Sequence, residues 1–163
     1  MQEQGGPAPA GRPPRLFTRL AHFWFLLTRP MTLGVRGLVL DDAGRALLVK
    51  HSYAPGWHLP GGGVEVGETF EQALARELAE EANVLIEGPA SLHGLFLNRR
   101  ISRRDHVAVY VVRRFRVTGE RPPDREILAA RFFPVDALPP DTTRGTRSRL
   151  KEALGGAPPT AEW

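Results

Sequence analysis

Apolar positions along the chain predict several short strands around one amphipathic helix. Residues 32–40 and 45–51 are rich in Val and Leu and flank the turn sequence Asp41–Gly44, which indicates two strands joined as a hairpin. Further strands are predicted at residues 84–86, 91–97, 106–117 and 130–135, and short helical pieces at 136–138 and 147–154.

The main helix is predicted from Phe70 to Ala82. Thr69 suits the N-cap, and Gln72 three residues later completes a capping box. The segment between is rich in Ala, Leu, Glu, Gln and Arg and contains no Gly or Pro. Asn83 can adopt the left-handed conformation that ends a helix, although glycine does so at lower cost.

The glutamates of this helix lie on an unusual face. On a wheel of about 100° per residue, Phe70 at 0° and Leu74 near 40° define an apolar stripe. Glu81 falls near 20°, Glu77 near −20° and Glu80 near −80° on the same wheel of about 100° steps. A solvated charge run would place them opposite the stripe, so two of them are expected beside the core.

Carboxylates in such positions need a compensating cation. Like charges at these spacings repel by roughly 0.2–0.5 kcal/mol per pair, and burying them unpaired costs far more. Mg²⁺ takes one or two carboxylates together with water and phosphate oxygens. The pattern therefore predicts a metal site, with a structural charge cluster as the alternative. Arg76, one turn from Glu80, can orient a neighbouring carboxylate.

A glycine-rich loop, Ser52–Gly63, precedes the helix. Its three consecutive glycines, Gly61, Gly62 and Gly63, allow the backbone to approach phosphates or a metal closely. A plain turn is the alternative. Trp57 in this loop suits stacking on a nucleobase and equally suits burial in the core.

The stretch from Gly62 to Val84 resembles the Nudix box of the Nudix hydrolases. Glu68 follows Gly62 after five residues, and the run Arg76–Val84 follows after seven more. Asn83 stands where the family has glycine. Flanking residues extend the resemblance, namely Trp57–Gly61 before the box and Arg131–Pro134 near the end.

The resemblance implies an α/β fold, the Nudix α/β/α sandwich, with a mixed sheet between helices and the metal site on the box loop and helix. It implies Mg²⁺-dependent hydrolysis, with Mn²⁺ as an alternative ion, of a nucleoside diphosphate linked to another moiety X. The products would be a nucleoside monophosphate and X-phosphate. An ADP-ribose-like substrate is favoured. A (d)NTP pyrophosphohydrolase and a non-catalytic nucleotide- or RNA-binding module are the alternatives, and the presence of all box acids favours an enzyme.

The resemblance also implies roles for the box residues. Glu80 and Glu81 would hold the metal, and Glu77 would be a further ligand or would activate the water. Arg76 and Glu68 would orient these carboxylates. The backbone at Gly61–Gly63 would approach the metal and the phosphates.

One acid and one basic loop outside the box are further candidates. Family members often use an acid after the box as an extra ligand or base, and Glu126 is our candidate, ahead of Asp124 and Glu120. A surface salt bridge is the alternative for Glu126. The loop Asn98–Asp105 carries four arginines, which suits a solvated connection or a phosphate or nucleic-acid contact through Arg99 and Arg100.

Composition is consistent with this assignment. A chain of 163 residues with 25% charged and 42% apolar residues is typical of one globular domain. The absence of cysteine excludes disulfides, thiolate zinc sites and a cysteine nucleophile, and it is compatible with the cytoplasm, where we expect the protein. The net charge of +4 favours anionic ligands.

Four segments are expected along the chain. Residues 1–15 are rich in Gly and Pro and are predicted to be a disordered tail. Residues 16–31 form an apolar helix or extension that is too short to span a bilayer, which needs about 20 apolar residues. This segment would cover the core or a homodimer partner, with a membrane-surface anchor as the alternative. Residues 32–154 form the Nudix domain, and residues 155–163 a loose tail.

Overall fold

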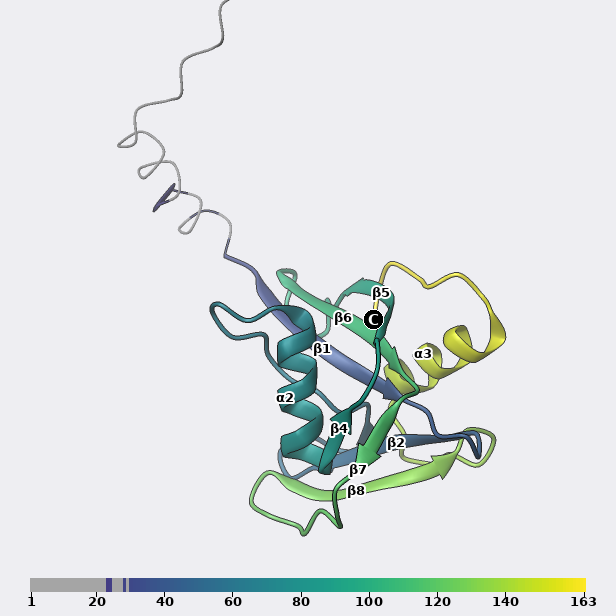
Figure 1. Ribbon diagram of the computed structural model, residues 1–163. Coiled ribbons are helices and arrows are strands. Elements are labelled where there is room, and N and C mark those ends of the chain that lie inside the picture. Colours follow the sequence, from purple (N-terminus) through teal and green to yellow (C-terminus); the bar gives the residue numbers. More distant parts are fainter. Residues whose placement is uncertain (1–22, 25–27, 29) are drawn as a thin grey trace, which may run out of the picture. The chain divides into compact units, whose positions relative to one another are not determined.

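The computed structural model describes residues 23, 24, 28 and 30–163 (Figure 1). The chain divides into two compact units, residues 1–30 and residues 31–163. The predicted disordered tail, residues 1–15, lies outside the described residues. So does most of the predicted apolar helix or extension, residues 16–31. Phe23, Trp24 and Thr28 have helical backbone, and the Thr28 hydroxyl donates to the Trp24 carbonyl at 2.8 Å. Among the described residues, no helix has the length and apolar character needed to cross a membrane.

Two three-stranded sheets and one strand pair organise residues 31–163. The first sheet is mixed, because β1 (Thr32–Val39) runs parallel to β6 (Asp105–Val112) and β6 runs antiparallel to β5 (Ser91–Leu97). The second sheet is antiparallel and has the order β3 (Trp57–His58), β2 (Arg45–His51), β8 (Ile127–Pro134). The short strands β4 (Val84–Ile86) and β7 (Phe115–Val117) pair with each other.

The expected hairpin around Asp41–Gly44 is a turn without a two-strand ladder. The Asp41 N–H donates to the Arg45 carbonyl at 3.0 Å, and one isolated bridge joins Leu40 to Ala46. Beyond that bridge β1 pairs with β6, while β2 pairs with β3 and β8. Consecutive residues of β2, from Ala46 to Val49, are buried, so both faces of the strand are covered. The hairpin prediction was wrong because these strands form their hydrogen-bonded pairs with strands that are distant in the sequence, namely β1 with β6 and β2 with β8.

Helices lie on both sides of the mixed sheet (Figure 1). On one side, Leu74 and Leu78 of α2 (Phe70–Ala82) pack in the same core as Val35 of β1. On the other side, Leu150 of α3 (Arg144–Gly155) packs in the same core as Leu38. Side chains of β1 therefore alternate between two cores, as the pleat of a strand requires. This arrangement confirms the predicted α/β/α sandwich with a mixed sheet.

Three segments differ from their sequence prediction. The strand predicted over residues 106–117 is interrupted at Arg113–Arg114, and residues 136–138 do not form a helix. The final residues are held against β5, in contrast to the expected loose tail. The Leu97 N–H donates to the Ala161 carbonyl at 3.0 Å, and the Trp163 N–H donates to the Leu97 carbonyl at 3.1 Å. The Trp163 ring packs edge-on against Phe96, with 6.1 Å between centroids.

Candidate active site

The box helix begins and ends as the sequence predicts. The Thr69 hydroxyl accepts the Gln72 N–H at 3.2 Å, and the Gln72 side chain accepts the Thr69 N–H at 2.8 Å. Asn83 closes the helix with φ 53°, in the left-handed region, and its N–H donates to the carbonyls of Leu78 and Ala79. The helix therefore has a fixed start and stop, which fixes the direction in which its glutamates project.

The glycine loop lies along β1. The Val35 N–H donates to the Gly62 carbonyl at 2.9 Å, and the Gly37 N–H donates to the Pro60 carbonyl at 2.8 Å. A Cβ on Gly62 would come within 2.5 Å of the Glu77 carboxylate, so a side chain at this position would displace the end of Glu77. Gly63, in contrast, has open space around the place of a Cβ.

Glu81 is buried at the centre of the candidate site. Its Oε2 accepts the Gly61 N–H at 2.7 Å, and its Oε1 lies 3.7 Å from Nε2 of His51. The pKa of Glu81 is raised to about 7, chiefly by burial. The Gly61 N–H and Arg36 act to lower this pKa, and the charges of Glu77 and Glu126 act to raise it. This carboxylate is short of positive charge, which is the electrostatic property expected of a cation ligand.

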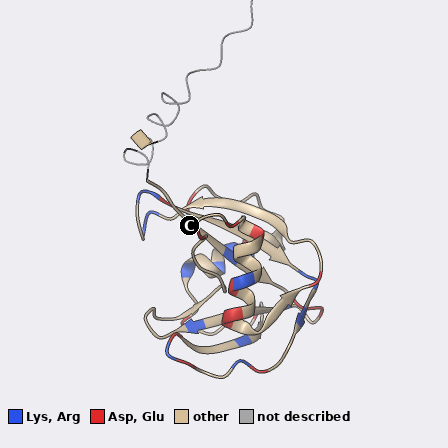
Figure 2. Cartoon of the chain, turned by 60° about the vertical axis from the view of Figure 1, so that its left-hand side comes forward, with Lys and Arg blue, Asp and Glu red and all other residues tan. Residues whose placement is uncertain are grey.

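Arg76 binds the other box carboxylates. Figure 2 shows that acidic and basic residues lie together along α2. Its Nε and Nη2 donate to the two Glu68 oxygens at 2.8 and 3.0 Å, and these hydrogen bonds lower the pKa of Glu68 to about 2. Its Nη1 donates to Glu77 at 2.8 Å, and Glu80, which is largely exposed, lies 3.5 Å away. Nη2 also donates to the Gly63 carbonyl at 3.0 Å. One guanidinium thus fixes two carboxylates and the loop.

Replacing Arg76 with lysine is expected to lower kcat by roughly 10- to 100-fold. A single ammonium group cannot reproduce the forked contacts to Glu68, Glu77 and the Gly63 carbonyl. The control is Arg116→Lys, which alters an exposed pair with Glu87 (2.9 Å) away from the box and should keep wild-type kcat. Steady-state kinetics of both variants test this, and equal kcat values would contradict the orienting role of Arg76.

Two residues at this site were not predicted from the sequence. Arg36 of β1 donates to the carbonyls of Leu59 and Gly61, which steadies the loop beneath Glu81. His51 is buried, and neither ring nitrogen has a hydrogen-bond partner within the described residues. Burial lowers the pKa of His51 to about 4. The signal in each case was a single polar residue within or at the end of an apolar strand.

The candidates after the box divide into two kinds. The Glu126 carbonyl accepts the Ser52 N–H at 2.9 Å, and the preceding residue, His51, lies 3.7 Å from the Glu81 carboxylate. Asp124 instead stabilises the turn, since its Oδ1 accepts the N–H groups of Glu126 and Ile127 at 2.8 and 2.7 Å. The carbonyl of Glu120, rather than its carboxylate, forms the hydrogen bond described for that residue.

Three residues outside the glycine loop backbone were also predicted to contact the substrate, namely Trp57, Arg99 and Arg100. Trp57 is buried and packs edge-on against Phe133 at 4.7 Å between centroids. This burial supports the core-packing alternative, and a contact of Trp57 with a base stays a prediction. Arg99 pairs with Glu162 at 2.8 Å, and Arg100 is exposed in the same loop. A contact of these arginines with nucleic acid or substrate stays a prediction.

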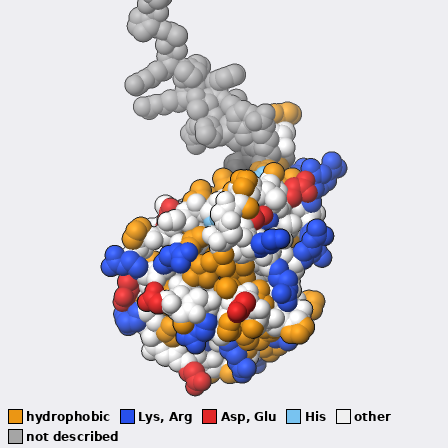
Figure 3. Space-filling view, turned by 90° about the vertical axis from the view of Figure 1, so that its right-hand side faces the viewer, with side chains coloured by type: hydrophobic (Ala, Val, Ile, Leu, Met, Phe, Trp, Pro, Cys, Tyr) orange, Lys and Arg blue, Asp and Glu red, His pale blue; other side chains and the backbone are white. Residues whose placement is uncertain are grey.

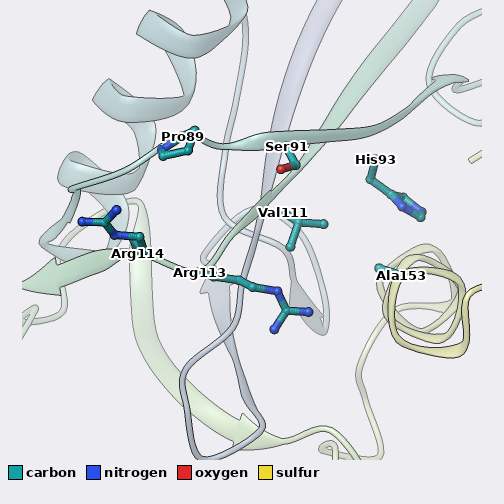
Figure 4. A pocket seen from close by; sticks show the side chains of 7 residues that line it. All are labelled: Pro89, Ser91, His93, Val111, Arg113, Arg114 and Ala153. Atoms are coloured by element: carbon teal, nitrogen blue, oxygen red, sulfur yellow. The ribbon is translucent and has the colours of Figure 1, made fainter.

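A separate groove of about 330 Å³ lies away from the box (Figure 4). The Arg113 side chain projects from the sheet beside it, and Ala153 of α3 lines the opposite wall. Lys and Arg side chains are also scattered over the face shown in Figure 3, around an apolar area. Residues of the Nudix box do not line the groove, which is lined by Pro89, Ser91, His93, Val111, Arg113, Arg114 and Ala153.

The donor set at the box fits a divalent metal ion in its chemistry. Glu77, Glu80 and Glu81 offer hard oxygen ligands, which Mg²⁺ and Mn²⁺ accept. Glu81 is buried and lacks a full positive partner. Within the part of the chain that the structure describes, no three His, Asp or Glu side chains already converge into a metal cluster. Water and substrate phosphates would therefore complete the coordination of an ion held here.

Comparisons with known proteins identify the family of the chain. The NUDIX domain model matches residues 30–154. A MutT-like protein of Streptomyces ambofaciens is 31% identical over 78% of this chain and 80% of its own. An ADP-ribose pyrophosphatase of Methanocaldococcus jannaschii is 34% identical over 66% of this chain and 64% of its own. The crystal structure of a MutT NUDIX hydrolase from Burkholderia pseudomallei has a TM-score of 0.63 and 31% identity, and the match covers 74% of this chain and 95% of that one.

Other matches cover shorter parts of their relatives. A Bacillus subtilis protein named as an 8-oxo-dGTP diphosphatase and an RNA pyrophosphohydrolase of Halorhodospira halophila are matched over 34% and 33% of their lengths. With the family model covering most of the chain, the chain belongs to the Nudix family. The names of its relatives support a hydrolase that acts on phosphoric anhydride bonds.

Proposed function

We propose that the chain is a Mg²⁺-dependent pyrophosphohydrolase of a nucleoside diphosphate linked to another moiety, with an ADP-ribose-like compound as the favoured substrate. The products would be a nucleoside monophosphate and a phosphorylated second moiety. The observation that carries this proposal is the buried Glu81, held by the Gly61 N–H beside carboxylates that Arg76 orients. The archaeal relative named ADP-ribose pyrophosphatase supports the substrate class. A cytoplasmic location goes with this proposal.

The roles proposed for the box follow from these contacts. Glu77, Glu80 and Glu81 would hold the ion, which would offset the negative charge of the phosphate oxygens during the reaction. The backbone of Glu126 is bound to Ser52, the residue after His51, which lies beside Glu81. Glu126 would serve as a further ligand or as the base that takes a proton from the attacking water. Arg76 and Glu68 hold Glu77 in place, and Gly61 and Gly62 bring the backbone next to these carboxylates.

A (d)NTP pyrophosphohydrolase is the second candidate, because one relative is named as an 8-oxo-dGTP diphosphatase. A product-release screen separates the two. Purified protein with Mg²⁺ or Mn²⁺ is offered ADP-ribose, nucleotide sugars, dinucleoside polyphosphates, coenzyme A, capped RNA and the (d)NTPs. We expect the fastest turnover with ADP-ribose-like compounds and a nucleoside monophosphate as product. Fastest turnover of a triphosphate would favour the second candidate, and no turnover of any compound would refute the enzymatic proposal.

A further inference from the structure

The C-terminal end of the box helix is joined to the loop that carries Glu126. The side-chain Nδ2 of Asn83 donates to the Glu120 carbonyl at 2.9 Å. The Asn83 carbonyl accepts the N–H of Thr118 at 2.9 Å and its hydroxyl at 3.1 Å. A glycine in this position could keep the two hydrogen bonds that its carbonyl accepts, but it has no side-chain amide to donate to the Glu120 carbonyl.

Arg121 makes a second connection between the same helix and the same loop. Its Nε donates to the carbonyl of Glu80 at 2.8 Å, and its Nη2 pairs with Asp124 at 2.6 Å. Asp124 in turn accepts the backbone N–H groups of Glu126 and Ile127. A continuous set of hydrogen bonds therefore leads from the last turn of α2 to the backbone of Glu126.

The loop is held from its other side by the end of β2. The Ser52 N–H donates to the Glu126 carbonyl at 2.9 Å, and the Ser52 hydroxyl donates to the Arg125 carbonyl at 2.7 Å. The backbone of Glu126 is thus fixed from both flanks. It lies beside the end of β2, where His51 pairs with Ile127 and His51 Nε2 lies 3.7 Å from the Glu81 carboxylate. Loss of one flank is expected to let the carboxylate move relative to the box.

We propose that Asn83 is a positioning residue whose side-chain amide fixes the Glu120–Glu126 loop to the box helix and thereby sets the place of the Glu126 carboxylate in the active site. This inference rests on the proposed function, in which Glu126 is a further ligand or base. It also gives a physical role to the residue that departs from the Nudix box, because the hydrogen bond to Glu120 is one that the family's glycine cannot make.

The chain offers a clean variant and a matched control. Asn83→Gly removes the amide while glycine adopts the left-handed conformation freely, so the helix end is not strained. The melting temperature is expected to change little, because two effects on the free energy of unfolding oppose each other. Glycine adopts the left-handed conformation at lower cost than asparagine, and the variant loses one hydrogen bond. Glu120→Ala keeps the backbone carbonyl that Asn83 binds, and it should behave as wild type in every measurement.

We expect Asn83→Gly to lower kcat by roughly three- to tenfold, which corresponds to one hydrogen bond that holds a reacting group. Amide hydrogen exchange of Glu126 and Ile127 should become faster in this variant at unchanged melting temperature. The decisive measurement is a double-mutant cycle with Glu126→Gln. If Asn83 acts through Glu126, Asn83→Gly causes no further loss of kcat in the Glu126→Gln enzyme.

Equal losses of kcat in both backgrounds, or wild-type kcat and wild-type exchange in Asn83→Gly, overturn the positioning role. Wild-type turnover of Glu126→Gln alone contradicts the role given to Glu126 and removes the inference with it. Absence of turnover in the wild-type protein refutes the proposed function instead. In that case hydrogen exchange across residues 118–127 alone decides whether Asn83 holds the loop.

Discussion

Glu81→Gln is expected to lower kcat by roughly 10³-fold while leaving the protein folded, the scale seen when one preorganised electrostatic group is removed. Glutamine keeps an oxygen that can accept the Gly61 N–H, so the loop should stay in place. What disappears is the negative charge that a divalent cation requires. Kinetics together with titration of Mn²⁺ binding by electron paramagnetic resonance check both points. Near wild-type turnover would refute the metal-binding role of Glu81.

The same variant is expected to be more stable than the wild-type protein in chelator at pH 8. The folded-state pKa of Glu81 is raised from 4.5 to about 7. A carboxyl group with a raised folded-state pKa loses stability as the pH rises from its unfolded value to its folded value, because the folded state binds more protons. The difference corresponds to about 3 kcal/mol above pH 7. Glutamine has no proton to lose, so its stability should not fall through this range.

Chemical unfolding at pH 4 and pH 8 measures this effect. The advantage of Glu81→Gln over wild type should be present at pH 8 and nearly absent at pH 4, where the wild-type carboxyl is neutral in the folded state and mostly neutral in the unfolded state. Glu87→Gln is the control, since Glu87 is an exposed residue paired with Arg116. An equal gain in stability at both pH values would show that the buried charge is not the cause.

Gly61→Ala is expected to destabilise the protein by roughly 3–5 kcal/mol and to abolish activity with it. Gly61 has φ 133°, a conformation that L side chains rarely adopt, and a Cβ there would overlap the Val35 carbonyl oxygen. Relief of that clash must move the loop away from β1. Because the Gly61 N–H binds Glu81, such a movement also removes the contact that holds the central carboxylate.

Gly63→Ala provides the comparison, two residues away in the same loop. No atom lies within 4 Å of the place of its Cβ, so its midpoint of unfolding should stay close to wild type. Thermal and urea unfolding of both variants give the measurement. Similar destabilisation of the two would mean that the loop requires glycine for a reason other than the close packing of Gly61 against β1.

The box helix could be predicted from the sequence because all its determinants are local. The capping box of Thr69 and Gln72, the helical interior and the left-handed Asn83 lie within fifteen residues, and the structure confirms each of them. The Nudix resemblance implied that Arg76 and Glu68 both orient the box carboxylates. Their hydrogen bond to each other, across eight residues, was not predicted.

Features that depend on distant segments could not be predicted. The turn at Asp41–Gly44 shows that the chain reverses, but it does not show that β2 will pair with β8. From the sequence alone, Trp57 suits stacking on a base and burial in the core equally well. Its contact with Phe133, which is distant in the sequence, is visible only in the structure. The C-terminal segment lacks an apolar pattern, and it is held through Trp163, Phe96 and the buried Arg149, which contacts the Glu162 carbonyl at 3.1 Å.

The parallel pairing of β1 with β6 has a consequence for the order of folding. Thr32 meets Asp105 across 73 residues of sequence, so the mixed sheet forms only after a long loop has closed. The helix that carries the glutamates can form early from local interactions, but its apolar stripe then has no sheet to cover it. Proteins rich in such long-range contacts fold slowly, on a scale of about milliseconds to seconds. Glu81 would be removed from solvent only in this late step. The raised pKa that burial gives this carboxylate would therefore be established at the end of folding.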